Sequence, residues 1–477
     1  MSFFGLVRSV LIGDNRTAKI EIGETVNIEF FGGAETVTGS KFLVQENETR
    51  ILVDCGMFQG LKRLRLMNWE SLGFDAAKID AVILTHAHLD HCGALPILVK
   101  QGFKGPIYCT EPTLELAKII LLDSAKIQEE DAEYANRKGF SKHHPALALY
   151  TVKEAENVLP LMKAISLHQE RKVGDLAFTL YGSGHILGAA SALVSSSTKK
   201  VYFSGDLGRY NDPLMFPPEA PPAADVIIME STYGDRDHSL VSSKDFLKEC
   251  ILEVCKSRGV LLIPSFSVGR MQNLLHEIVE LKRSEEIPGQ VPIFANSPMG
   301  DEASALYEKF HDFHRLGSGQ FAEVLSEVHS VKTAEDSKNL NETLSRPMIV
   351  VAASGMLTGG RILHHVKSFG GDPRNILLLA GFQSAGTRGA SLLEGARELK
   401  IHGRMHPINC KVVASDSFSA HADRNDLVTW LKSAERVPQR VLLVHGEISA
   451  AEALRSKIQA EAGIETEIAK LGQSITI

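Results

Sequence analysis

Three histidines and one aspartate occur within six residues of this chain, directly after a short apolar run. The run spans residues 81–84, and His86, His88, Asp90 and His91 follow it. Because side chains two apart on an extended segment face the same side, His86 and His88 can meet at one point in space. Asp90 and His91 follow as the chain turns into a helix and can reach a neighbouring point. The cluster therefore predicts a strand that ends at a site for two metal ions.

Three more candidate ligands lie far downstream, as a site assembled in space requires. His185, Asp206 and His445 each follow a β-rich apolar run and stand next to a glycine. Glycine permits the sharp turns that project a side chain into a cleft. A lone histidine at one of these positions would usually be structural, so the prediction depends on their occurrence together with the cluster.

The chain resembles the metallo-β-lactamase superfamily, whose signature is an HxHxDH motif followed by a distal His, a distal Asp and a last His. The order of motif residues along this chain is the same: Asp54, the cluster, His185, Asp206 and His445. The resemblance implies two zinc ions that share Asp206, although Mn²⁺ or Fe²⁺ would also suit His and Asp ligands. Asp54 would orient a ligating imidazole, a role that carboxylates often have beside metals. For Asp54 the alternative of a polar cap that closes a strand stays open. The implied ligands are His86, His88, His185 and Asp206 for one ion, and Asp90, His91, Asp206 and His445 for the other.

Three further segments resemble motifs A, B and C of the β-CASP nucleases, the branch of this superfamily that cleaves nucleic acids. They are Met229–Gly234, Ser417–Asp423 and Leu443–Glu447, and the resemblance covers nearly the whole chain from about Val26. In that family a histidine in motif C is associated with RNA substrates. The resemblance therefore implies a zinc-dependent ribonuclease, with endonucleolytic and 5′-to-3′ exonucleolytic cleavage both open, and it allows a homodimer.

Hydrolysis of a phosphodiester also needs a proton for the departing oxygen. We expect His421 to supply it and Glu230 to orient His421, because a nearby carboxylate raises the pKa of an imidazole and fixes its tautomer. We expect Asp90 to be both a metal ligand and a catalytic residue. The alternatives are a salt bridge or strand-end cap for Glu230 and a structural hydrogen bond for His421.

The pattern changes between about residues 235 and 402. Apolar runs at 260–264, 348–351 and 376–379 are each followed by a Ser/Gly/Arg-containing loop and then a helical segment. This succession predicts a parallel, doubly wound sheet, in which ligands gather at the carboxyl ends of the strands. The loops offer hydroxyls and guanidinium groups that suit phosphate oxygens, with ordinary turn and helix-start roles as the alternative. The candidate substrate contacts are Ser267, Arg270, Arg361 and Arg388.

The expected fold is α/β: a metallo-β-lactamase αββα sandwich with an inserted doubly wound α/β β-CASP domain. We expect the first domain at 1–234, the insert at 235–402 and the return to the first domain at 403–477. A helix is expected from Thr113, as its N-cap, and another at about 450–462. The insert would lie over the first domain as a lid.

Composition limits the remaining function classes. The chain has 477 residues, 44% of them hydrophobic, and no apolar run long enough to span a membrane. Residues 1–8 do not resemble a signal peptide, and the six cysteines lack CxxC spacing, so a cytoplasmic location is expected. The net charge of −7 argues against strong non-specific nucleic-acid binding. The basic run Lys62, Arg63 and Arg65 is either a solvated loop or a substrate contact.

Three other function classes stay open. A hydrolase of small esters or thioesters would use the same ligands, but it would have no reason to carry motifs A to C and the long insert. A DNA nuclease is disfavoured by His445. A non-catalytic RNA-binding subunit is disfavoured because every ligand position is filled.

Overall fold

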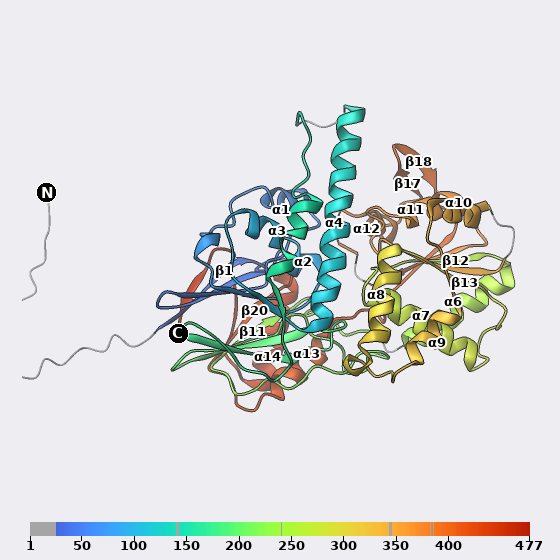
Figure 1. The fold of residues 1–477 in the computed structure, drawn as a ribbon. Helices are drawn as coiled ribbons and strands as arrows, with labels where there is room; N and C mark the ends of the chain where they lie inside the picture. Colours follow the sequence, from blue (N-terminus) through green and yellow to red (C-terminus); the bar gives the residue numbers. More distant parts are fainter. Residues whose placement is uncertain (1–24, 140–142, 240, 343–345, 382, 385) are drawn as a thin grey trace, which may run out of the picture.

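Three large β-sheets organise the chain, two in one half of the molecule and one in the other (Figure 1). The computed structural model describes residues 25–139, 143–239, 241–342, 346–381, 383–384 and 386–477. The prediction about a signal peptide concerns residues 1–8, which lie outside the described part.

The first two sheets each contain seven strands and pack face to face. Inward-facing side chains of both sheets, such as Ile28, Val44, Val194 and Val201, form one shared hydrophobic core. The first sheet runs in the order β22 (Ser474–Thr476), β1 (Val26–Gly32), β2 (Lys41–Glu46), β3 (Thr49–Val53), β4 (Ala81–Ile83), β5 (Ile107–Cys109) and β6 (Met162–Ala164). The second runs in the order β21 (Thr466–Ile468), β20 (Arg440–Val444), β11 (Val226–Glu230), β10 (Lys200–Phe203), β9 (Ala190–Ser195), β8 (Leu176–Gly182) and β7 (Arg171–Val173).

Helices cover the outer face of each of these sheets. Leu116 and Leu121 of α4 pack with Val82 and Ile107 of the first sheet. Trp430 and Leu454 belong to the helices α13 and α14, which pack in the same way on the second sheet. The result is the predicted αββα sandwich. Its helices are α1 (Lys62–Met67), α2 (Leu89–Cys92), α3 (Leu95–Lys100), α4 (Glu111–Lys138), α5 (Val152–Glu156), α13 (Arg424–Lys432) and α14 (Ile448–Ala462).

The third sheet has six strands, and every pairing in it is parallel. It runs in the order β14 (Val328–Ser330), β13 (Ile293–Asn296), β15 (Met348–Ala352), β12 (Val260–Pro264), β16 (Ile376–Ala380) and β19 (Lys411–Ser415). Each face is covered by a separate hydrophobic cluster, so the sheet is doubly wound as predicted. Around it lie α6 (Ser243–Ser257), α7 (Arg270–Arg283), α8 (Pro298–Lys309), α9 (Gln320–Ser326), α10 (Ala334–Glu342), α11 (Ile362–Phe369) and α12 (Arg388–Leu393).

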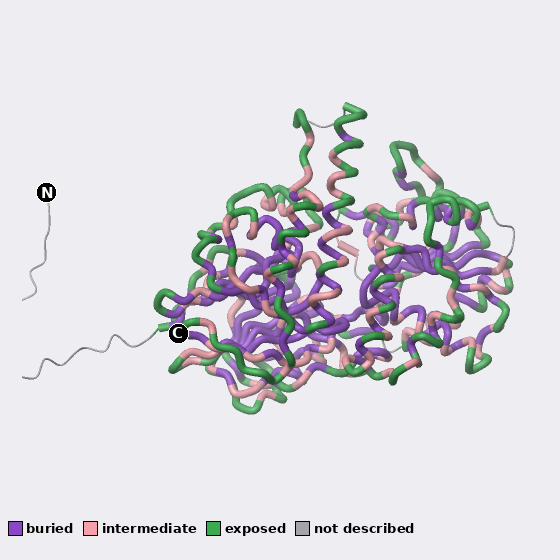
Figure 2. Tube along the Cα trace, viewed as in Figure 1, coloured by how far each residue is buried: buried purple, intermediate pink, exposed green. Residues whose placement is uncertain are grey.

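Two elements project from this core. The far end of α4 is exposed (Figure 2), and β17 (Glu398–Ile401) pairs with β18 (Arg404–Pro407) in a separate hairpin. The prediction that Thr113 caps α4 is wrong: the N-cap is Thr110, whose hydroxyl accepts a hydrogen bond from the Thr113 backbone N–H. Pro112 explains the difference, because proline suits the first turn of a helix and so places the cap before it. Within the described part, no helix combines the length and apolar character that crossing a membrane requires.

Candidate metal centre

The seven candidate ligands lie beyond the ends of strands in the two packed sheets. His86 to His91 follow β4, His185 lies between β8 and β9, and Asp206 follows β10. His445 follows β20, which runs parallel to β11, as β11 does to β10. Parallel strands end at the same edge of a sheet, so residues far apart in sequence meet there. His445 has a φ angle of 47°, in the left-handed region that non-glycine residues rarely adopt. Such backbone conformations are concentrated at functional sites.

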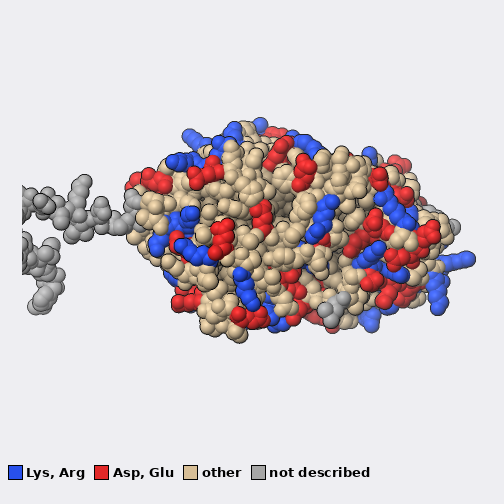
Figure 3. Space-filling model, turned by 90° about the horizontal axis from the view of Figure 1, so that it is seen from below, with Lys and Arg blue, Asp and Glu red and all other residues tan. Residues whose placement is uncertain are grey.

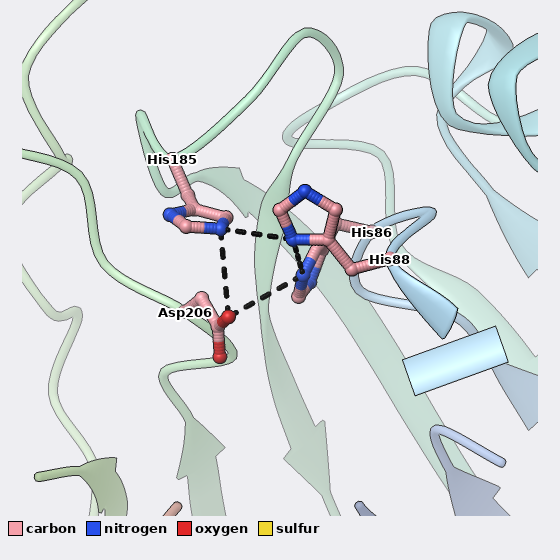
Figure 4. A group of neighbouring side chains, drawn as sticks. All are labelled: His86, His88, His185 and Asp206. Carbon is pink, nitrogen blue, oxygen red and sulfur yellow. Dashed lines mark hydrogen bonds and ion pairs between the residues drawn. The ribbon is translucent and has the colours of Figure 1, made fainter. Parts of the chain in front are cut away.

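His86, His88, His185 and Asp206 form the first group, with one potential ligand atom from each residue within 4.8 Å of the others (Figure 4). His88 Nδ1 lies 3.2 Å from Nε2 of His86 and 3.2 Å from Nε2 of His185. Asp206 Oδ2 lies 3.4 Å from His86 Nε2 and 3.5 Å from His185 Nε2. Three imidazole nitrogens and one carboxylate oxygen thus converge on one point.

Asp90, His91 and His445 form a second group beside the first. The Nε2 atoms of His91 and His445 lie 3.2 Å apart, and Asp90 Oδ2 lies 3.5 Å from His445 Nε2. Asp206 presents its other oxygen, Oδ1, to this group, 3.2 Å from His91 Nε2 and 3.6 Å from His445 Nδ1. Asp206 therefore stands between the two groups, with one carboxylate oxygen toward each.

Asp54 contacts His91 of the second group on the side of the ring away from the other ligands. Its Oδ2 atom lies 2.7 Å from Nδ1 of His91, which leaves Nε2 of His91 facing Asp206 and His445. Asp54 also accepts hydrogen bonds from the backbone N–H and the hydroxyl of Thr85, each at 2.8 Å. These contacts place it where a residue that orients a ligating imidazole would stand.

Sequence reasoning missed two threonines at this centre. Thr85 lies 3.2 Å from Nδ1 of His86 through its hydroxyl, and so links Asp54 to the first group. The Thr232 hydroxyl lies 3.1 Å from Nδ1 of His445 and donates to the backbone carbonyl of His445. The available signal was position: Thr85 begins the dense cluster, and Thr232 stands two residues after Glu230 in motif A.

Burial and charge suit His86, His185 and Asp206 to a cation. Burial, together with the neighbouring histidines, lowers the pKa values of His86 and His185 well below the usual range. Burial acts against ionisation of Asp206, but the surrounding histidines outweigh it and lower its pKa well below the usual range. Neutral imidazole and ionised carboxylate are the forms that bind metals. Asp206 Oδ1 is also buried without a hydrogen bond of normal geometry. The donor set and this unsatisfied oxygen both fit a divalent ion.

Glu230 and His421 form a pair at the edge of the first group. His421 Nδ1 lies 3.2 Å from both carboxylate oxygens of Glu230 and 3.9 Å from Asp206 Oδ2. Glu230 is fully buried, and its Oε1 accepts the backbone N–H of Leu207, which fixes the carboxylate. Burial lowers the pKa of His421, but Glu230, Asp206 and Asp90 outweigh burial and raise it to about 9. The His421 ring packs 4.4 Å from the ring of His185.

The four candidate substrate contacts come after parallel strands of the third sheet, and each is hydrogen-bonded within the protein. Ser267 lies in the loop after β12, Arg361 is the N-cap of α11, and Arg270 and Arg388 are the first residues of α7 and α12. Ser267 pairs with the Ser297 hydroxyl. Arg270 is buried and donates to the carbonyl of Ala380. Arg361 and Arg388 donate to backbone carbonyls, including those of Val331 and Lys400. These hydrogen bonds fit the alternative interpretation, in which the four residues have structural roles in turns and at helix starts. Contact of these residues with substrate stays a prediction.

Comparison with known proteins agrees with this architecture. The metallo-β-lactamase superfamily model matches residues 36–251, the Beta-Casp domain model matches 271–392, and the model of the Zn-dependent metallo-hydrolase RNA specificity domain matches 405–469. A solved structure of a protein of unknown function from Enterococcus faecalis V583 shares the fold, with a TM-score of 0.53 at 14% identity over 95% of this chain and 100% of that one.

Several curated proteins are similar to most of this chain. The ribonuclease TTHA0252 of Thermus thermophilus is 35% identical, over 94% of this chain and 99% of that protein. An RNase J-like protein of Methanocaldococcus jannaschii is 32% identical over 88% and 93%, and Integrator complex subunit 11 of Danio rerio is 31% identical over 95% and 74%. The chain is therefore a member of the β-CASP family of metallo-β-lactamase-fold metal-dependent hydrolases.

Proposed function

We propose that this protein is a zinc-dependent ribonuclease with a binuclear metal centre. The observation that carries the proposal is the position of Asp206, which presents Oδ2 to one group of histidines and Oδ1 to the other. The first ion would be held by His86, His88, His185 and Asp206. The second would be held by Asp90, His91, Asp206 and His445.

RNA is the proposed substrate for three reasons. A ribonuclease is similar to this chain over 99% of its own length. The segment 405–469 matches a model described as an RNA specificity domain. His445, the motif C residue associated with RNA in the family resemblance, belongs to the second group. We propose internal cleavage of the strand, in RNA processing or decay.

Bound divalent ions would lower the pKa of a shared water to about 7 and neutralise charge on the phosphoryl group. His421 would donate a proton to the departing oxygen, and it lies beside the first group, next to Asp206 and His185. Glu230 would hold Nδ1 of His421 and leave its other ring nitrogen free to face the leaving group. Asp90 would both bind the second ion and help to orient the attacking water.

The remaining predictions concern organisation. We propose the domain limits 1–234, 235–402 and 403–477. Because β19 (Lys411–Ser415) pairs with β16 in the third sheet, the chain re-enters the sandwich only after β19. Contact of Ser267, Arg270, Arg361 and Arg388 with substrate, a homodimer and a cytoplasmic location stay predictions.

A cleavage assay with matched single-stranded RNA and DNA, labelled at the 5′ end, tests the proposed function. We expect internal cuts in RNA, intact DNA, and loss of activity in Asp90→Ala and after chelation. Asp312→Ala, which removes an exposed carboxylate far along the chain, is the matched control. Cleavage of DNA alone would point to a DNA nuclease. Intact nucleic acid with metal bound would point to a hydrolase of small esters or thioesters.

A further inference from the structure

A cavity of about 660 Å³ lies where the sandwich and the third-sheet half of the chain meet. Its volume is in the range of pockets that hold ligands. Arg65 of α1 lines one side of it, and residues around α12 and the β17–β18 hairpin line the other. None of the seven proposed metal ligands is among its lining residues. In Figure 1, α1, α12 and the hairpin lie along the same upper side of the molecule.

Positive charge dominates the lining of this cavity. Arg65, Arg388 and Lys400 contribute cations, and Glu398 is the single carboxylate among the lining residues. The side chains of Arg65 and Lys400 form no ion pair with any residue in the described part of the chain. Arg388 is held in place by hydrogen bonds to the carbonyls of Leu357, Thr358 and Lys400. A concave surface with unpaired cations attracts anions.

This concentration of cations stands out against the rest of the chain. The net charge is −7. Figure 3 shows the face seen from below, where Lys and Arg alternate with Asp and Glu over both halves. A net positive hollow on the upper side is therefore a local feature and not a consequence of overall composition.

Both walls of the cavity connect to the metal centre through short, packed segments. On one side, Leu61 at the start of α1 reaches to about 4.0 Å from where a Cβ on Gly386 would lie. Gly56, a few residues earlier, packs against the backbone of Asp90. On the other side, β16 ends at Ala380, whose carbonyl accepts from Arg270.

The segment that carries Arg270 also contacts the loop of His185. The residue before Arg270, Gly269, packs against Ile186, the neighbour of His185. The cavity and the metal centre are thus linked through packed segments of the same boundary.

An exposed aromatic side chain stands four residues after Arg65, outside the lining of the cavity. Trp69 follows α1 closely and is 56% exposed, and Leu66 beside Arg65 is 50% exposed. Proteins that bind single-stranded nucleic acids combine basic grooves with aromatic side chains on which bases stack. The same features would not be needed to bind inorganic phosphate.

We propose that this cavity, through Arg65 and Lys400, binds the phosphate backbone of single-stranded RNA at nucleotides beyond those at the metal centre. The inference rests on the proposed ribonuclease function. It assigns one basic residue of the run at 62–65 to substrate binding, and it makes the affinity for RNA depend on the length of the strand.

The test is single-turnover cleavage with excess enzyme, which yields the enzyme concentration for half-maximal rate. Wild type and Arg65→Gln/Lys400→Gln are compared on RNAs of about 5 and about 20 nucleotides at several salt concentrations. We expect the half-maximal concentration for the longer RNA to rise about tenfold, with a several-fold smaller rise for the shorter one. The slope of log affinity against log salt should decrease by about 1.4, because each lost single-strand phosphate contact contributes about 0.7.

The matched control is Lys104→Gln/Lys172→Gln, which removes two exposed lysines of the sandwich. Equal losses for both RNA lengths, no loss, or the same loss in the control pair would overturn the proposal. A second result would also overturn it: inorganic phosphate inhibits the wild type but not the double variant, and the effect of the double variant does not depend on RNA length. That result would assign a small-anion site. Wild-type protein that cleaves neither RNA would instead refute the proposed function.

Discussion

The Oδ2 atom of Asp54 lies 2.7 Å from Nδ1 of His91, and this contact leaves Nε2 of His91 3.2 Å from both Asp206 Oδ1 and His445 Nε2. Asp54 itself has a φ angle of 60° and is held by two hydrogen bonds from Thr85. Thr85 therefore holds the Asp54 carboxylate in the position from which it orients the His91 imidazole. A buried Asp–His pair of this kind sets both the tautomer and the direction of the ligand atom.

Replacement of Asp54 by Ala should weaken metal binding about 10- to 100-fold, because His91 loses the partner that orients it. The measurement is metal retention in a chelator titration. Asp312→Ala, which removes an exposed carboxylate, is the control. Unchanged retention in Asp54→Ala would show that Asp54 only caps its strand.

Asp206 and His445 should differ in how many ions their loss removes. Asp206 faces both groups, so Asp206→Ala should retain less than about one equivalent of metal. His445 belongs to the second group alone, so His445→Ala should retain about one equivalent. Elemental analysis after dialysis measures both. Equal metal content in the two variants would contradict the sharing of Asp206.

His421→Gln and Glu230→Gln should each lower kcat for RNA by about 100- to 10,000-fold, the usual contribution of a general acid. Metal content should stay at the wild-type value in both variants, which separates proton donation from ligand loss. His329→Gln, an exposed histidine at the edge of the third sheet, is the control. Full turnover in His421→Gln with both ions bound would assign His421 a structural role.

Glu277 should make stability depend on pH. Burial raises its pKa from 4.5 to about 7, although the Ser243 hydroxyl, Arg209 and Lys244 act in the opposite direction and Asp212 acts with burial. The folded state therefore binds the proton more tightly than the unfolded state. The stabilisation is fully present below pH 4.5 and is lost as the pH rises to about 7, with an upper limit of roughly 3 kcal/mol.

Glu277→Gln should therefore gain stability relative to wild type between pH 5 and pH 8. Urea unfolding at the two pH values measures the difference. Glu280→Gln removes a more exposed carboxylate of the same helix and serves as the control. A gain that does not change with pH, or that the control reproduces, would contradict the assignment to Glu277.

The meeting of Asp206 and His445 could be predicted because each follows a strand of the second sheet, and strands that run parallel in one sheet end together. His86 follows β4 of the first sheet, so its approach to Asp206 depends on how the two sheets pack against each other. The contacts of Thr85 and Thr232 could not be predicted in this way, because they depend on which hydroxyl lies beside which ring after folding.

The hydrogen bonds of the arginines could not be predicted from the sequence either. A Ser/Gly/Arg loop after a strand predicts an available guanidinium, but the carbonyls that Arg361 and Arg388 reach belong to distant segments. The cavity between α1 and α12 also depends on the packing of two separate sheets. Arg65 and Lys400 face the same hollow only because of that packing, and their spacing in the sequence carries no sign of it.

The central claim is that RNA hydrolysis depends on two ions at the centre shared by Asp206. The most direct test adds Zn²⁺ stepwise to metal-free protein and measures cleavage of a single-stranded RNA at each step. We expect activity to stay low through about the first equivalent and to rise with the second, with internal cuts in the RNA. Maximal cleavage after one equivalent, or intact RNA after two are bound, would contradict the account.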